Sequence, residues 1–222
     1  DNGNTWSWFN AGLPSGDRII PQIIMDPDNG NMYALLTGDY GTWSNRAKTG
    51  IYFLDVVGGA TSWTLLRGTV NYPPNADSGY KVWWYPTRFA IDFKDPQRNT
   101  LWLLDYENNG NWLMTGAWKS IDRGQTWDRK IQFTHPTGIQ IDPNDSDNVF
   151  VSGFHELKGN WGNGGQIYTA DGGVTWKKNL TPELQHNGFN AMIDPTNPDN
   201  IYYTYFGGGI LKGPNPVRKP AS

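Results

Sequence analysis

The sequence of 222 residues contains no cysteine. This excludes disulfide bonds and cysteine-ligated metals, although it does not fix the compartment in which the protein works. It also lacks any run of about 18 apolar residues that could cross a bilayer, and any stretch with a basic start and an apolar middle that would serve as a leader. We therefore expect no membrane insertion. If the protein is secreted, its leader has already been removed.

Positive charge is scarce as well. The 18 Lys and Arg residues against 21 Asp and Glu residues give a net charge of −3, and no basic cluster accompanies the aromatic residues. Binding to phosphate backbones needs a concentrated basic face, so we expect no nucleic-acid partner. No glycine-rich loop has the form that cradles a nucleotide phosphate, and the three His residues have no repeated spacing. We therefore expect no cofactor and no metal.

Glycine, proline and aromatic residues are plentiful, and helical periodicity is missing. The chain has 27 Gly and 15 Pro residues, and 14% of its residues are aromatic. No long segment repeats its apolar residues at a spacing of about 3.6. This composition predicts an all-β chain of many short strands joined by frequent turns.

A short motif, Ser-x-Asp-x-Gly-x-Thr-Trp, recurs along the chain. It occurs at residues 120–127 and, with Thr in place of Ser, at residues 169–176. The chain begins inside a further copy at residues 1–6, and a degenerate copy occupies residues 55–63. The terminal Trp residues of these copies recur at intervals of roughly 50 to 60 residues, a period typical of a β-propeller blade with about four short strands.

Each repeat also contains an Asp-Pro-type turn followed by an aromatic or β-branched run. These units occupy residues 23–39, 90–106, 139–154 and 191–209. The sequence therefore predicts a single propeller domain over residues 1–222, built of about four four-stranded antiparallel blades. The blades are expected at residues 17–67, 78–130, 135–180 and 186–213, the last closed by residues 1–10.

The two ends of the chain leave two interpretations open. The C-terminal unit supplies three strands, and the N-terminal segment supplies a motif and a fourth strand, so together they would complete a blade. Alternatively, the chain is part of a larger propeller that is completed by remaining blades or by another protein chain.

Alternation of strand direction assigns the turns to two faces. If the strands of a blade are named a to d, the a–b and c–d turns share one face, and the b–c and d–a loops share the other. Asp accepts hydrogen bonds from the amides that follow it, Gly permits positive φ, and Trp covers the turn, so the motif has a structural role. A calcium interpretation of residues 142–148 is weaker, because the Gly and the distal Glu of the familiar loop are missing. The motif residues to which we assign a structural role are Asp1, Trp6, Asp122, Gly124, Trp127, Asp171, Gly173 and Trp176.

The b–c and d–a loops are long and aromatic. Trp residues stand among Asn, Gly and Asp in three b–c loops, and a cluster of Trp and Tyr lies in the segment 69–88. Flat aromatic rings beside amides and carboxylates suit sugar rings, whose C–H faces stack on indoles. Packing between blades is the alternative for any one of these rings. The predicted substrate-binding residues are Trp43, Trp112, Trp161, Trp83, Trp84, Tyr85, His155 and Glu156.

Several units resemble the Asp-box (BNR) propellers, and among them the family-74 glycoside hydrolases that cleave xyloglucan and the sortilin-type receptors. The units IDPNDSDNVFV, GGQIYTADGGVTWKK and GAWKSIDRGQTWDRK carry this resemblance, which covers essentially the whole chain. The Asp box also occurs in sialidases, but their arginine triad cannot be located in this sequence. The resemblance implies a bacterial protein that is secreted or displayed at the cell surface and acts on a polysaccharide.

Family-74 enzymes are inverting hydrolases with two loop-face aspartates. Asp39 is the nearest counterpart of one of them, although the Gly-Gly pair of the family is missing here and the loop is longer. Asp105 and Glu107 occupy the corresponding point one blade further on. The resemblance thus implies Asp39, Asp105 and Glu107 as candidate catalytic residues. The alternative is a non-catalytic sortilin-like or adhesion propeller that binds protein or glycan.

Overall fold

The computed structural model describes residues 5–15, 19–37, 48–66, 69–71, 85–106, 115–132, 135–155, 161–179, 188–205 and 208–218. Every helix or strand assigned in this part of the chain is a β-strand, which confirms the all-β prediction. None of the described segments forms an apolar helix of membrane-spanning length.

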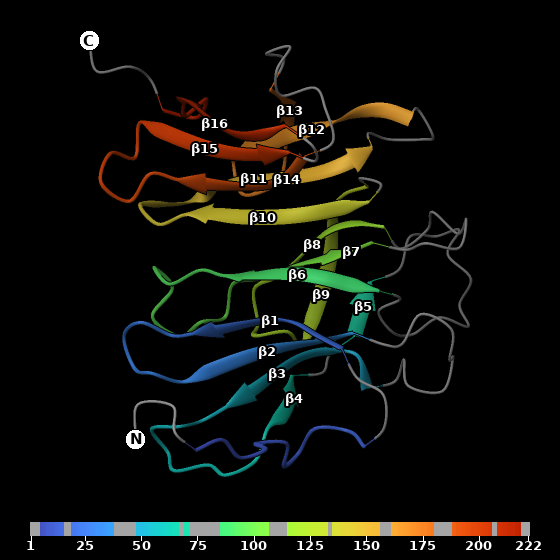
Figure 1. The fold of residues 1–222 in the computed structure, drawn as a ribbon, viewed down its shortest axis with the longest axis vertical. Coiled ribbons are helices and arrows are strands. Elements are labelled where there is room, and N and C mark those ends of the chain that lie inside the picture. The colour runs from blue at the N-terminus through green and yellow to red at the C-terminus, as the bar shows by residue number, and fades with distance from the viewer. Residues whose placement is uncertain are drawn as a thin grey trace.

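The described strands form four sheets that follow one another in chain order, as Figure 1 shows from blue to red. In each sheet, consecutive strands of the a–d series pair antiparallel. The first sheet consists of β1 (Ile19–Met25), β2 (Met32–Thr37), β3 (Gly50–Leu54) and β4 (Thr64–Leu66). The second contains β6 (Pro86–Ile91), β7 (Leu101–Asp105), β8 (Gly116–Ser120) and β9 (Thr126–Ile131). The third contains β10 (Pro136–Asp142), β11 (Asp145–His155), β12 (Trp161–Ala170) and β13 (Lys177–Lys178). The fourth contains β14 (Gly188–Ile193), β15 (Asn200–Tyr205) and β16 (Gly209–Pro214).

One further strand joins the second sheet. β5 (Thr69–Asn71) pairs in parallel with β9, outside the meander of the other strands. The repeat pattern did not predict this strand, because it assigned residues 69–88 as a whole to the segment between two blades.

The sheets pack face to face through alternate residues of their strands. In β7, Leu101 and Leu103 pack toward the first sheet, whereas Trp102 and Leu104 pack toward the third. All four side chains are fully buried. A strand covered on both faces is expected to be a continuous apolar run, and β7 is one because neighbouring sheets enclose it on both sides.

The a–b turns of the four sheets are closed by equivalent aspartates. The residues are Asp26, Asp92, Asp142 and Asp194, and each carboxylate accepts the backbone N–H two residues further along the chain. The N···O distances are 3.0 Å, 2.9 Å, 2.9 Å and 3.0 Å, in the same order. Each Asp is therefore the first residue of an Asx turn that reverses the chain between strands a and b.

The two complete Asp boxes form the c–d turns of the second and third sheets by one shared set of bonds. Asp122 accepts hydrogen bonds from the backbone N–H and the hydroxyl of Thr126, at 2.8 Å and 2.6 Å. Asp171 accepts the same pair from Thr175, at 2.8 Å and 2.5 Å. The Ser or Thr that opens each box donates to the same carboxylate at 2.7 Å. These bonds within the turn account for the recurrence of Asp, Ser or Thr, and Thr in the motif.

These bonds also change the acidity of the box carboxyls. Burial acts to raise the pKa of Asp122, but the hydrogen bonds from Thr126, Ser120 and Gln125 outweigh it and leave the pKa below its usual value. The bonds from Thr175, followed by that from Thr169, lower the pKa of Asp171. Both groups therefore favour their ionised form more strongly in the folded chain than in the unfolded chain.

The N-terminal segment lies against the first sheet rather than the fourth. The indole N–H of Trp63 donates to the carbonyl of Phe9 at 3.2 Å, and its backbone N–H donates to Ala11 at 2.8 Å. Gly12 is needed for this approach, because a Cβ at this position would lie 2.1 Å from the carbonyl oxygen of Trp63. The prediction that residues 1–10 close the fourth blade is therefore wrong for the described residues 5–10. Trp63 supplies two donors and an aromatic ring beside this segment.

A buried ion pair joins the first two sheets. Arg98 lies in the a–b turn of the second sheet, and its guanidinium bonds to both carboxylate oxygens of Asp26, at 2.8 Å and 3.0 Å. The Arg98 side chain is 7% exposed and that of Asp26 is 0% exposed. The guanidinium also contacts the carboxylate of Asp28. Because both partners are buried, removal of either one leaves an uncompensated charge or polar group.

We predict that Arg98→Met lowers the free energy of unfolding by about 3 kcal/mol, because it leaves the Asp26 carboxylate buried without its cation. Chemical denaturation in urea measures this change. Arg218→Met is the matched control. It removes the equivalent pair with Asp142, in which the arginine side chain is 25% exposed and the aspartate side chain is 0% exposed, and should cost less than Arg98→Met because solvent reaches the guanidinium. Equal losses of stability in the two variants would contradict the stabilising role that we assign to the buried Arg98–Asp26 pair.

The same pair predicts a dependence of stability on pH. The hydrogen bond from Arg98 is the largest cause of the lowered pKa of Asp26, whose ordinary value is 3.8. A carboxyl with a lowered pKa in the folded state stabilises the fold above its unfolded pKa, and this contribution is lost as the pH falls. The wild type should therefore lose more stability than Arg98→Met between pH 5 and pH 2, values set by about one to two units on either side of the ordinary pKa. Parallel curves for the two proteins would disprove this expectation.

Candidate functional site

The face formed by the b–c and d–a loops carries a row of aromatic rings at the ends of strands a and b. Tyr85 lies just before β6 and Tyr106 just after β7 in the second sheet. In the third sheet, His135 lies just before β10, and Phe154 is the penultimate residue of β11. Phe189 lies at the start of β14 in the fourth sheet. We call these five residues the aromatic row.

The rings of the aromatic row form two groups, within each of which neighbouring rings lie within contact distance. The ring centroids of Tyr85 and Tyr106 are 6.2 Å apart, those of Tyr106 and His135 are 4.6 Å apart, and those of Phe154 and Phe189 are 6.0 Å apart, all with edge-to-face geometry. The Tyr106–His135 contact joins the second sheet to the third, and the Phe154–Phe189 contact joins the third to the fourth. The row therefore crosses two junctions between sheets.

Equivalent backbone bonds position the row in the second and third sheets. The N–H of Tyr106 donates to the carbonyl of Tyr85 at 3.0 Å, and the N–H of Phe154 donates to the carbonyl of His135 at 3.2 Å. Both β6 and β10 begin with Pro, which fixes the chain entry, and the pairing register of each strand shifts directly afterwards. Tyr85 and His135 are thus structurally equivalent, as are Tyr106 and Phe154.

Asp105, a predicted catalytic residue, lies beside the aromatic row at the end of β7. Its side chain is fully buried, and its Oδ1 accepts the backbone N–H of Tyr85 at 2.7 Å. This bond ties the segment that enters β6 to the end of β7. Through this hydrogen bond, Asp105 positions Tyr85.

The structure places the other predicted residues in different ways. Tyr85 is half-buried within the aromatic row. The backbones of His155 and Trp161 lie opposite one another where β11 meets β12, so the third sheet brings these two positions together. The predicted site residues outside the described part of the chain are Asp39, Trp43, Trp83, Trp84, Glu107, Trp112 and Glu156.

The structural motif residues are distributed as follows. Trp127 is buried, and its indole N–H donates to the carbonyl of Gly124 at 3.0 Å. Trp176 is partly buried and packs edge-on against Trp102, at 6.1 Å between ring centroids. Gly173 approaches Trp102, since a Cβ there would lie 2.8 Å from the indole. Trp6 is 91% exposed, and Asp1 lies outside the described residues.

Four members of the aromatic row were missed at the sequence level: Tyr106, His135, Phe154 and Phe189. A usable signal was present, because Tyr85-Pro86 and His135-Pro136 place an aromatic residue and a Pro at the same point of two repeats. The search for Trp in the longest loops passed over these shorter strand-end positions.

The aromatic row can provide apolar ring surfaces together with the hydroxyl groups of tyrosine and the imidazole of histidine. Carboxylates are scarce beside it. In the described part of the chain, every Asp other than Asp105 and Asp128 lies in or next to an a–b or c–d turn. The same part contains no group of three His, Cys, Asp or Glu residues that could hold a metal ion. Stacking and hydrogen bonding are therefore the chemistry that the described residues offer.

Comparisons with known proteins show the fold. No protein-family model and no curated protein matches the chain. Among solved structures, it is similar to a family-74 glycoside hydrolase (GH74) of Niastella koreensis, with a TM-score of 0.54 and 17% identity over 86% of this chain and 28% of that one. It is also similar to YCF48 bound to D1 peptide, with a TM-score of 0.53 and 15% identity over 89% and 51% of the two chains. A third similar structure is an auxiliary nutrient binding protein from Bacteroides thetaiotaomicron, with a TM-score of 0.58 and 9% identity over 93% and 44%.

These likenesses confirm the predicted fold class. The chain is a GH74-like β-propeller array of antiparallel sheets, and it spans about half or less of the length of each of these structures. At such identities the likeness extends to the fold, because one fold carries many functions.

We predict that Asp105→Ala lowers the free energy of unfolding by about 2 kcal/mol, because it removes a fully buried carboxylate and leaves the part-buried N–H of Tyr85 without this acceptor. Asp105→Asn retains an amide oxygen at this position and should cost less than about 1 kcal/mol. Urea denaturation of both variants measures the difference. Equal losses would show that the bond to Tyr85 does not determine the role of Asp105.

Proposed function

We propose that the protein is an extracellular bacterial propeller that binds a polysaccharide on the face formed by the b–c and d–a loops. The observation that carries this proposal is the aromatic row, in which Tyr85, Tyr106 and His135 form one group of ring contacts and Phe154 and Phe189 another, at centroid distances of 4.6 to 6.2 Å. The sequence predicts that the Trp-containing b–c loops belong to the same face.

The shape of the row favours a polymer over a single small sugar. Tyr85 and Tyr106 belong to the second sheet, His135 and Phe154 to the third, and Phe189 to the fourth. A chain of sugar rings that crosses these junctions would meet an aromatic ring at each step, with stacking on its C–H faces. Tyrosine hydroxyls and the imidazole can bond to sugar hydroxyls, which supplies orientation. The fold likeness to a GH74 enzyme adds an example of a related architecture in a glycoside hydrolase.

Inverting hydrolysis is the further step of this proposal. It needs two carboxyl groups about 6.5 to 9.5 Å apart on either side of the scissile bond. Asp39, Asp105 and Glu107 are the candidates, and Asp105 is fully buried and bonded to the backbone of Tyr85. Binding is therefore the better-supported part, and hydrolysis would require Asp39 and Glu107 to provide the pair.

Recognition of a protein is the second candidate function. Half-buried aromatic rings also suit apolar side chains, and the chain is similar in fold to a propeller bound to a peptide. The two candidate functions differ in the ligand that binds to the aromatic row, which is a polysaccharide in the first and a protein in the second.

The test is binding to a panel of soluble polysaccharides that includes xyloglucan, measured by calorimetry and by retardation in polysaccharide-containing gels. Tyr106→Ala should weaken binding about tenfold, which corresponds to the loss of one stacking contact of about 1.4 kcal/mol. Trp8→Ala is the control for nonspecific aromatic binding, since Trp8 is 92% exposed and belongs to the N-terminal segment. The polysaccharide affinity of Trp8→Ala should stay at the wild-type level.

Three results separate the candidates. Retention of every polysaccharide affinity in Tyr106→Ala would contradict a binding site on the aromatic row. Failure of the wild type to bind any polysaccharide, together with capture of an apolar peptide, would favour protein recognition. Release of reducing ends by the wild type, lost in Asp39→Asn with binding retained, would establish hydrolysis.

A further inference from the structure

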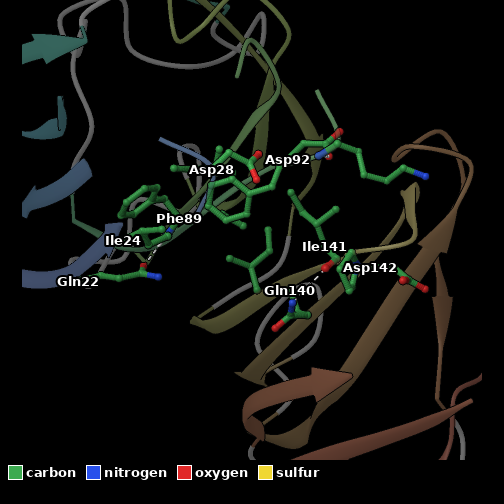
Figure 2. A pocket seen from close by; sticks show the side chains of 14 residues that line it. Gln22, Ile24, Asp28, Phe89, Asp92, Gln140, Ile141 and Asp142 are labelled. Atoms are coloured by element: carbon green, nitrogen blue, oxygen red, sulfur yellow. Dashed lines mark hydrogen bonds between the residues drawn. The ribbon is translucent and has the colours of Figure 1, made fainter. Parts of the chain in front are cut away.

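A pocket of about 310 Å³ opens between the first strands of three sheets, at the opposite end of these strands from the aromatic row. It lies over β6 and is flanked by β1 and β10. Figure 2 shows Asp28 and Asp92 on one side of it, and Gln22 and Gln140 on the other. Its volume is at the lower end of the range for small-ligand pockets, which is about 300 to 1,000 Å³.

Asp92 differs from the three other turn aspartates in what surrounds its carboxylate. Asp26 bonds to Arg98, Asp142 bonds to Arg218, and Asp194 bonds to Lys212. In two of these cases a guanidinium bonds to both oxygens of the carboxylate. Each of these turns thus combines an Asx turn with a cation.

Asp92 has the Asx turn without the cation. Its Oδ1 accepts the N–H of Lys94, and no described residue donates to its Oδ2. The residue is 4% exposed and lines the pocket. A buried carboxylate is normally paired, so an unpaired one at a cavity marks a place for a cationic ligand.

The sequence explains the missing cation. Arg98 reaches Asp26 from the a–b turn of the next sheet. The corresponding turn after β10 reads Asp-Pro-Asn-Asp-Ser-Asp-Asn over residues 142–148 and contains no Lys or Arg.

The lysines near Asp92 are engaged elsewhere. Lys94 also lines the pocket, but its ammonium donates to the carbonyl of Asn144 at 2.6 Å. Lys119 donates to the carbonyl of Gly172 at 3.1 Å and lies over the ring of Trp102. Of the acids that line the pocket, Asp28 and Asp142 already contact Arg98 and Arg218. Among the described residues, Asp92 is therefore the one lining carboxylate that forms no ion pair, although Lys119 interacts with it electrostatically from beyond ion-pair distance.

The rest of the pocket fits an aliphatic stem and an amide. Ile24, Ile139 and Ile141 line its middle. At the far side, Gln22 accepts the N–H of Phe89 through its Oε1, which leaves its NH₂ group as a donor. Gln140 donates to the carbonyl of Ile141, which leaves its Oε1 as an acceptor. One carboxylate, an apolar middle and a donor-acceptor pair match an arginine side chain and its backbone amides.

We propose that this pocket binds an arginine residue of a peptide, with the guanidinium on Asp92 and the backbone amides at Gln22 and Gln140. Guanidinium fits better than ammonium because it bonds to both carboxylate oxygens, as Arg98 and Arg218 do at the equivalent turns. The site is independent of the proposed glycan surface, since it lies at the a–b turns.

The experiment titrates N-acetyl-L-arginine amide into the wild type by NMR or calorimetry. N-acetyl-L-citrulline amide, which has nearly the same shape without the charge, should bind at least tenfold more weakly. Asp92→Asn should weaken binding of the arginine probe at least tenfold, and its amide oxygen can still accept the N–H of Lys94. Asp199→Asn, at an exposed turn position of the fourth sheet outside the pocket, should bind like the wild type.

Free L-arginine distinguishes the source of the guanidinium. Weaker binding of the free amino acid than of the capped probe supports a peptide arginine, and equal or tighter binding supports the free amino acid and overturns the peptide assignment. Absence of binding to the wild type, equal affinity for the citrulline probe, or a loss of less than tenfold in Asp92→Asn overturns the guanidinium site. Comparison of the melting temperatures of Asp92→Asn and the wild type shows whether a loss comes from unfolding.

Discussion

The hydrogen bond from a backbone N–H to an Asp carboxylate two residues earlier closes the a–b turns of all four described sheets. This bond uses one carboxylate oxygen and fixes the path from strand a to strand b. The second oxygen then faces a neighbouring element, and in three of the four turns it bonds to Arg98, Arg218 or Lys212. Each of these three turns is thereby joined to another segment of the chain by an ion pair. The pairs of Arg98 and Arg218 join adjacent sheets. The packing of Leu101 to Leu104 on both faces of β7 depends on that placement of neighbouring sheets.

The same constraint separates the two faces of the array. The a–b turns use their carboxylates for turn formation and ion pairs, and the exception is Asp92, which forms the turn without an ion pair. At the other face, Pro86 and Pro136 start strands that hold Tyr85 and His135 next to Tyr106 and Phe154. The proposed recognition by aromatic surface would use this second face, and the proposed recognition of a cation would use the Asp92 turn of the first.

The sequence predicted the bonding within the Asp boxes, because these bonds join residues two to four positions apart. It also predicted the succession of antiparallel sheets, because the motif recurs at a regular interval along the chain. The contact of Arg98 with Asp26 joins residues 72 positions apart and has no counterpart in the motif. The parallel strand β5 and the packing of Phe9 on Trp63 likewise depend on tertiary approach. The predicted acids and Trp residues remain predictions where they lie in loops outside the described residues. Asp105 lies at the end of β7, and its burial and its bond to Tyr85 could not be read from its position in the sequence.

The central claim is that polysaccharide occupies the loop face and leaves the turn face free. The most direct measurement is a map of backbone amide shifts by NMR during titration with xyloglucan oligosaccharides or with whichever polysaccharide binds. The account predicts that the perturbed amides cluster at Tyr85, Tyr106, Phe154 and Phe189, while the amides that follow Asp26, Asp142 and Asp194 stay unchanged. A cluster of perturbations at those a–b turns, with the aromatic row unaffected, would contradict it.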